Sequence, residues 1–485
     1  MTTRSASRPA ASSAQTMRLS QAAGRWVVFA TVLGSSVAML DMTVVNVALP
    51  ALARDLSASM AGLQWIVNAY TLTLAGLILL GGALGDRFGR RRVFVVGVVW
   101  FAVASALCGV AQDITTLVAA RALQGVGGAL LTPGSLAIIQ ASFHPDDRPR
   151  AIGAWSGFGG IAVAVAPFLG GWLVSTAGWR WVFFLNLPLA AIAVVVALRF
   201  VPESADDDAT GRFDVLGAVL AAAALAGITH ALTELPSVAS GGLAAFSGVA
   251  GVGAAVAFVL VERRRTRGRG PRPMLPLDVF GSRQFTAVNV VTFVVYAGLS
   301  VMVFLLVTHL QVVAGFSPTA AGSALLPTTV LMLALSARAG ALAQRIGPKL
   351  PMTFGLALGA IGMLLVARIG AGASFLVDVL PAVTVFGLGL TATVAPLTAT
   401  ALATVDGRHS GVASGVNNAV ARAAGLLAVA VIPPAVGLTG SALDDPAVVA
   451  SGFRAAMWVS AALLAAGAVI SLTGIRDDVL RPRIR

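Results

Sequence analysis

Two charged side chains lie inside long apolar segments, where a charge is costly and therefore informative. Asp41 lies within the stretch 26–50 and Arg121 within 114–139, and of the twenty Asp and Glu residues only Asp41 is placed well inside such a stretch. A charge at the centre of a bilayer costs about 3 kcal/mol on insertion scales, so both side chains must face protein or a water-filled cavity. Burial favours the neutral form of a carboxyl group, whereas a nearby cation favours the charged form. Asp41 beside Arg121 could therefore bind and release a proton; a fixed structural ion pair is the alternative.

Other polar residues in apolar stretches extend this candidate site. Gln124 lies one helical turn from Arg121, on a face whose other residues are small. Asn417, Asn418 and Arg422 form a separate cluster near the end of the chain. For that cluster we favour hydrogen bonding between helices, and contact with a substrate is the alternative.

The histidines give a weaker signal. His230 and Glu234 are four residues apart and would be neighbours on one helix. They could form an entry path for protons, but a position at the outer lipid headgroups is favoured, and the same holds for His309. Because the four histidines are scattered, no metal-ligand cluster or nucleophile–base pair is recognised. The sequence predicts neither an enzyme nor a cofactor.

The composition predicts the elements that must position these residues. Hydrophobic residues make up 57% of the 485 residues and charged residues 11%, with a mean hydropathy of +0.89, whereas soluble domains carry about 25% charged residues. A helix of about twenty apolar residues crosses ~30 Å of hydrocarbon. The sequence therefore predicts an all-α membrane protein with fourteen spans, near 26–50, 62–84, 93–112, 114–139, 151–175, 181–201, 213–236, 240–262, 284–311, 319–340, 350–372, 374–403, 411–436 and 452–474.

The basic residues predict which side of the membrane each loop occupies. Cytoplasmic loops are enriched in Lys and Arg. With the N-terminus inside, 27 of the 33 basic residues fall on the cytoplasmic side, four fall in outer loops, and Arg121 and Arg422 lie within spans. Both termini are thus expected in the cytoplasm. The net charge of +13 is explained by membrane topology and by contact with lipids, and not by binding to nucleic acid.

An internal repeat divides the chain. Residues 82–91, GALGDRFGRR, end the second stretch, and residues 340–349, GALAQRIGPK, end the tenth in the same register. Two related halves are typical of transporters. The expected units are a disordered cytoplasmic arm (1–25), a six-helix half (26–201), two additional helices with a basic cytoplasmic linker (202–283), a second six-helix half (284–474) and a cytoplasmic tail (475–485).

The first copy of the repeat contains an acid that topology alone does not explain. Asp86 could bind the N-terminal end of a neighbouring helix, where the helix dipole favours an anion, or pair with an arginine there. Either contact would latch one conformation. The residues expected to control the conformation in this way are Gly82, Asp86, Arg87, Gly89, Arg90 and Arg91.

Several motifs resemble those of the fourteen-span drug:proton antiporters of the major facilitator superfamily, the EmrB/QacA type. Residues 40–50, LDMTVVNVALP, which include Asn46, are similar to the motif of span 1. Residues 82–91, 121–125 (RALQG) and 178–188 (GWRWVFFLNLP) are similar to the motifs after span 2, in span 4 and at the start of span 6.

The motif of span 5 in that family is matched only in part. Pro167 and the pair Gly170-Gly171 are present, but Ala162 and Ala166 replace two glycines. We therefore expect helix packing or bending near Pro167 to differ from the family pattern.

The resemblance, which runs from the first span to the last, implies the major facilitator fold. It also implies proton-coupled export of drugs, antibiotics or other amphipathic compounds by alternating access, from a multi-pass protein of the bacterial plasma membrane that works as a monomer. With one deep carboxylate, neutral or monocationic substrates are favoured over dicationic ones. A proton-coupled transporter for a single metabolite is the alternative, and a channel or membrane-embedded enzyme is disfavoured. ATP-driven transport is excluded because Lys349, the only lysine, stands in Pro-Lys-Leu and not in a P-loop.

The predicted topology can be tested with a reporter enzyme that is active only outside the membrane. Fused after Arg485, it should be silent, because the positive loops hold both termini inside. Fused to a chain truncated after Arg54, it should be active. Strong activity after Arg485 would contradict the even number of spans.

Overall fold

The computed structural model describes residues 17–205, 214–234, 241–266, 275, 277–404 and 410–477. Within these residues, 14 helical segments are long and apolar enough to cross a membrane. The same residues contain no strand beyond one isolated bridge between Met17 and Phe143. The all-α class and the number of spans are therefore confirmed. Parts of the predicted arm (1–16), linker (206–213, 267–274 and 276) and tail (478–485) lie outside the described residues.

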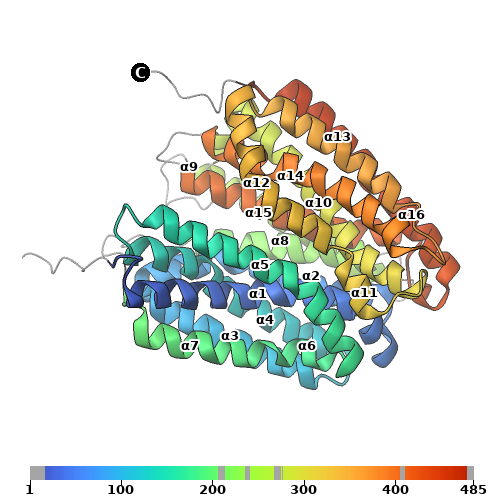
Figure 1. Ribbon diagram of the computed structural model, residues 1–485, viewed down its shortest axis with the longest axis horizontal. Helices are drawn as coiled ribbons and strands as arrows, with labels where there is room; N and C mark the ends of the chain where they lie inside the picture. Colours follow the sequence, from blue (N-terminus) through green and yellow to red (C-terminus); the bar gives the residue numbers. More distant parts are fainter. Residues whose placement is uncertain are drawn as a thin grey trace, which may run out of the picture.

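The first six spans form one group of helices, coloured blue to green in Figure 1. They are α1 (Ala22–Asp55), α2 (Met60–Phe88), α3 (Arg90–Val110), α4 (Ile114–Ser142), α5 (Arg148–Thr176) and a sixth span made of α6 (Arg180–Phe184) and α7 (Asn186–Phe200). Helix α4 packs on α2 and α3, while α1 packs on α5 and α7. The sixth span is interrupted at Leu185, so that α7 begins with Asn186 inside the span.

The last six spans form a second group, coloured yellow to red in Figure 1. They are α10 (Arg283–Val312), α11 (Pro318–Ser323) with α12 (Leu326–Ile346), α13 (Lys349–Val366), η2 (Phe375–Val379) with α14 (Leu380–Ala403), α15 (Ser410–Ala435) and α16 (Pro446–Gly474). Helix α10 packs on α15 and α16, and α13 packs on α14 and α16. The two groups are the predicted six-helix halves.

Two inserted helices, α8 (Val215–Glu234) and α9 (Gly241–Thr266), lie outside this pair of halves. Helix α8 packs on α9, and it also packs on α2 of the first half and α15 of the second. Of the apolar window of α9, only 11% is buried, which is expected for a helix that faces lipid. Helix α8 thus covers the line along which α2 and α15 meet.

The halves contact each other toward one end of the molecule. Near the end of α1, Gln311 Nε2 donates to the carbonyl of Val47 (3.0 Å), and the backbone N–H of Met60 donates to the carbonyl of Gly440 (3.0 Å). At the opposite end, Gly153 of α5 faces open space, since a Cβ atom added there would meet nothing within 4 Å. Figure 1 shows the halves diverging toward this end, where α1 begins and α16 finishes.

A close helix crossing stabilises the second half. A Cβ atom added at Gly389 of α14 would overlap the backbone of α13 at Gly355 and Gly359. Interhelical contact in membranes depends on such small residues, because lipid gives no hydrophobic driving force between helices. The glycine therefore sets the spacing of α13 and α14.

We expect Gly389→Val to destabilise the protein by about 1–3 kcal/mol, the usual range for overpacking. The measurement is thermal unfolding of the purified protein in detergent. Gly157→Val on α5 is the matched control, since a Cβ atom there meets nothing within 4 Å. Equal loss in both variants would show that helix propensity, and not the crossing, is responsible.

Candidate functional site

The two charges predicted to lie deep in the membrane form one buried ion pair. Asp41 on α1 and Arg121 on α4 are each 1% exposed, and Arg121 Nη1 contacts Asp41 Oδ2. Isolated, either charge would be costly in hydrocarbon, whereas a hydrogen-bonded pair offsets most of that cost. The sequence prediction that these residues meet agrees with the structure.

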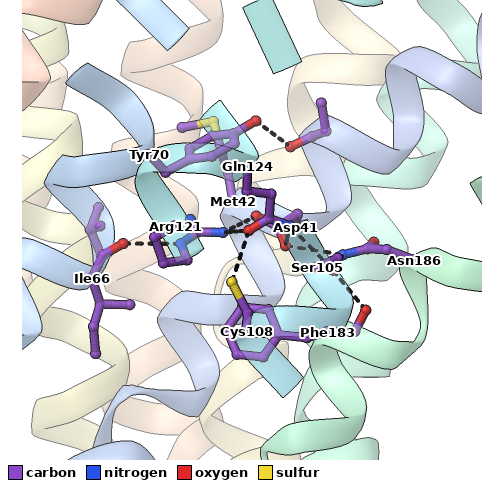
Figure 2. A network of polar contacts seen from close by, with 12 residues as sticks. Asp41, Met42, Ile66, Tyr70, Ser105, Cys108, Arg121, Gln124, Phe183 and Asn186 are labelled. Atoms are coloured by element: carbon purple, nitrogen blue, oxygen red, sulfur yellow. Dashed lines mark hydrogen bonds and ion pairs between the residues drawn. The ribbon is translucent and has the colours of Figure 1, made fainter. Parts of the chain in front are cut away.

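Every polar partner of Asp41 is a hydrogen-bond donor. Besides Arg121, Gln124 Nε2 (2.8 Å) and Asn186 Nδ2 (3.0 Å) both donate to Asp41 Oδ1. An ionised carboxylate only accepts hydrogen bonds, whereas a protonated one also carries an O–H that must donate. The arrangement in Figure 2 is therefore that of a carboxylate without its proton.

Arg121 is fixed by contacts on several sides. Its Nε donates to the carbonyl of Ile66 (3.0 Å), its Nη1 donates to Gln124 Oε1 (2.6 Å), and its guanidinium carbon lies 4.5 Å from the ring centre of Tyr70. An arginine over an aromatic ring gains a cation–π contribution. Helices α1, α2 and α4 are thereby joined through one guanidinium group.

A second layer of polar groups orients the amides that hold Asp41. Asn186 Nδ2 also donates to Ser105 Oγ (3.0 Å), and Ser105 donates to the carbonyl of Phe183 (2.8 Å). The thiol of Cys108 donates to Gln124 Oε1 (3.6 Å). Sequence reasoning missed Ser105, Cys108 and Asn186 as site residues. Only Asn186 carried a signal, because it stands in the motif 178–188.

A cavity of about 340 Å³ lies between the two halves. It is bounded by α1 and α2 on one side and by α10 and α15 on the other. Its lining is formed by Met42, Asn46, Val67, Asn68, Thr71, Tyr296, Leu299, Ser300, Val303, Phe304, Asn418, Ala421, Arg422, Gly425, Leu426 and Val429. A mostly apolar wall with a few polar groups is typical of a small-molecule site. Three predicted residues, Asn46, Asn418 and Arg422, thus lie together on the cavity wall.

A thin wall separates the ion pair from this cavity. Asp41 and Arg121 do not line the cavity, but Met42, the next residue after Asp41, does. Tyr70 contacts Arg121 with its ring and interacts electrostatically with Arg422. The ion pair is thus linked to the cavity through Met42, the chain neighbour of Asp41, and through Tyr70, which interacts with both Arg121 and Arg422.

Two predicted residues serve helix packing. Asn417 Nδ2 on α15 donates to Thr292 Oγ1 on α10 (2.7 Å) and lies 3.4 Å from Asn289 Oδ1, which is the interhelical bonding favoured from the sequence. Pro167 is buried in α5, and Gly322 of α11 approaches its carbonyl closely. The halves meet at this proline.

His230, His309 and Glu234 each have a hydrogen-bond partner outside the ion pair. On α8, His230 Nδ1 is hydrogen-bonded to Ser247 of α9 (2.8 Å), and Glu234 accepts from Trp65 Nε1 of α2 (3.0 Å). The expectation for His309 was wrong. It is 1% exposed, its ring stacks on Phe453 at 3.9 Å, and its Nε2 is hydrogen-bonded to the carbonyl of Ile369 (2.8 Å). Because packing against an aromatic ring excludes lipid headgroups, His309 is an interior residue of the second half.

The loop between α2 and α3 is a tight, charged turn. Gly89 closes it with a φ of +106°, which an L side chain adopts only with strain. Asp86 pairs with Arg90 four residues later (2.8 Å). Arg90 is the first residue of α3, so of the two contacts expected for Asp86 the structure has the one to an arginine at the start of the neighbouring helix. Glu203, which follows the sixth span, accepts from the backbone N–H of Arg91 (3.0 Å) and so caps α3.

The second copy of the repeat is capped in the same way. Gly347 has a φ of +95°, and Asp477 after α16 accepts from the backbone N–H of Lys349 (3.1 Å), at the start of α13. Carboxylates are favourable at helix N-termini because they meet unpaired N–H groups and the positive end of the dipole. Glu203 and Asp477 were missed from the sequence, because each lies more than 100 residues from the turn that it caps.

The comparisons with known proteins agree on one family. The sequence model of the Major Facilitator Superfamily matches residues 31–429. The probable actinorhodin transporter of Streptomyces coelicolor is 37% identical over 84% of this chain and 72% of its own length. The tetracenomycin C resistance and export protein of Streptomyces glaucescens is 35% identical over 84% of this chain and 74% of its own length. The multidrug resistance protein Stp of Mycobacterium tuberculosis is 34% identical over 81% and 72%, respectively.

Solved structures agree on the fold. A bacterial homologue of the human lysosomal transporter Spinster, in an inward-facing and unoccupied conformation, superposes with a TM-score of 0.66 at 17% identity, over 94% of this chain and 97% of that chain. A likeness at this identity supports the fold alone. Together with the fourteen spans, the matches confirm a multi-pass protein of the bacterial plasma membrane, a transporter and not an enzyme: the chain belongs to the major facilitator superfamily.

Proposed function

We propose that this protein exports amphipathic organic compounds in exchange for protons, as a monomer, with Asp41 as the group that takes up the proton. The observation that carries this proposal is the carboxylate of Asp41, buried inside a span and surrounded by donors, near a cavity between two halves. The names of the relatives, which include export and multidrug resistance proteins, support the export of drugs or antibiotics.

The donor shell of Asp41 couples protonation to movement. When Asp41 gains a proton, its O–H needs an acceptor, yet Arg121, Gln124 and Asn186 all present N–H groups to it. At least one of these groups must therefore withdraw its N–H or, if it is an amide, turn its oxygen toward the new O–H. Since they lie on α4 and at the start of α7, a withdrawal changes the packing of α1 within the first half.

Protonation also changes the charge that the cavity experiences. With Asp41 ionised, its charge cancels that of Arg121. With Asp41 neutral, Arg121 becomes a net cation next to Tyr70, which also interacts with Arg422 on the cavity wall. In a low-dielectric interior such a change acts strongly over a few ångströms. Proton binding and substrate binding can thereby exclude or favour each other, as an exchanger requires.

The arrangement of the halves fits one state of an alternating-access cycle. The halves touch at the end of α1 and diverge at the end where α1 begins and α16 finishes. With the cytoplasmic termini predicted from the arginine distribution, this is an inward-open state. We infer that the loop 82–91, at the diverging end, controls the return from it.

Asp41→Asn should abolish uphill efflux driven by a pH gradient, because the amide cannot titrate and adds N–H groups to a shell of donors. Substrate-induced proton release in reconstituted vesicles should fall at least tenfold at matched protein levels. Downhill exchange of a neutral substrate should partly survive, and Asp41→Glu should retain some activity.

Asp55→Asn is the control, since this acid on the same helix is exposed and pairs with Arg180 (2.8 Å) at its end. It should keep normal coupling. If Asp41→Asn still pumps uphill with normal proton release, Asp41 is structural, and Glu234 becomes the next candidate.

Asp86→Asn should slow transport severalfold while leaving protein level and substrate binding near normal, because it removes the ion pair with Arg90 from the turn. Transport rate and equilibrium binding are measured on the same vesicles. Asp113→Asn is the control: Asp113 caps α4 through Thr116 (2.8 Å) at the other end of the molecule. Full transport by Asp86→Asn would reduce the loop to a topology signal.

A further inference from the structure

Arg422 is the second arginine in the apolar interior, and it lacks the acidic partner that Arg121 has. It lines the cavity, its Nε is buried without a hydrogen-bond partner, and no carboxylate in the described part of the chain pairs with it. Its electrostatic neighbours are Tyr70 and Tyr296, the only two tyrosines of the chain. A phenol can accept a hydrogen bond from the guanidinium group but does not cancel its charge.

A second unsatisfied group lies on the same wall. Asn68 on α2 is 1% exposed, and its Nδ2 has no hydrogen-bond partner. Among the described residues that line the cavity, the buried atoms left without a partner are thus two donors, Arg422 Nε and Asn68 Nδ2. A buried donor without a partner is unfavourable, and more so when it is charged. What this wall lacks is an acceptor.

A cation finds no counterpart in the cavity. The described lining contains no carboxylate, and both oxygens of Asp41, which is not part of that lining, are engaged by donors. The rest of the wall is largely apolar, with Val67, Leu299 and Phe304 among its residues. A volume of about 340 Å³ is at the lower end of the range for small-molecule sites.

We propose that the cavity binds amphipathic organic anions, whose carboxylate or phenolate oxygen accepts hydrogen bonds from Arg422 and Asn68 while the apolar body packs on α2 and α10. This inference rests on the proposed function, because it names the substrate class of the same exporter. It revises the preference for neutral or monocationic substrates drawn from the sequence, which considered the deep carboxylate and favoured hydrogen bonding between helices over substrate contact for Arg422.

The test is equilibrium binding to the purified full-length protein in detergent, with three probes of one shape: 2-naphthoate, 2-naphthamide and 2-naphthylmethylammonium. The carboxylate should bind at least about tenfold more tightly than the amide, and the ammonium most weakly. Arg422→Gln should remove the preference for the carboxylate and leave binding of the amide within about twofold. Asn68→Ala should reduce the preference in part.

Arg368→Gln, which removes an exposed arginine of an outer loop, is the control for net charge and should behave as wild type. Equal or tighter binding of the amide or the ammonium by the wild-type protein would overturn the proposal, and this comparison holds even if Arg422→Gln fails to fold. A preference that persists in Arg422→Gln would also overturn it. Because no proton gradient is present, these outcomes are independent of proton coupling by Asp41.

Discussion

The ion pair between Asp41 and Arg121 is the constraint around which the first half is arranged. A carboxylate cannot stay ionised in hydrocarbon unless its oxygens are occupied by donors, and the donors here come from α4 and from the start of α7. The interruption of the sixth span at Leu185 brings Asn186 to the depth at which the carboxylate lies. The guanidinium group in turn holds the carbonyl of Ile66 on α2. One charge pair thus fixes the relative positions of four spans. A change in its protonation therefore alters contacts of all four.

The two interior arginines are in opposite situations, and the difference defines their roles. Arg121 has an acid, an amide, a carbonyl and an aromatic ring as partners, so its charge is balanced within the protein. Arg422 has two neutral phenols and an open cavity. Burying an arginine without a counter-ion is unfavourable, so the site is best balanced when something negative enters. Export of an anion and entry of a proton each make the inside of the cell more positive. The membrane potential, at about 2.3 kcal/mol per charge per 100 mV, would then assist such a cycle.

The sequence was sufficient for the features that depend on local composition. Long apolar runs and the arginine distribution predicted fourteen spans, and a lone acid in an apolar run identified Asp41. The sequence could not predict contacts between segments that are far apart in the chain. Nothing near Glu203 shows that it caps a helix that begins more than 100 residues earlier, and nothing near Ser105 shows that it orients Asn186. His309 was misplaced for a related reason: a histidine near the end of an apolar run has the same neighbours in sequence whether it meets headgroups or stacks on Phe453.

The repeat separates what the fold needs from what the transport cycle needs. In both copies a glycine with positive φ closes the turn, and a carboxylate from the last span of that half caps the next helix. Helix capping alone explains these shared parts, since each half needs the same tight turn between its second and third spans. Asp86, in contrast, corresponds to Gln344 in the second copy, so its ion pair with Arg90 is not required to build the turn. A charge that occurs at only one of two equivalent turns makes the halves unequal at the end where they diverge. Two identical turns would respond alike when the diverging ends of the halves close. The ion pair of Asp86 instead gives the first half a contact that this closure can break or exchange.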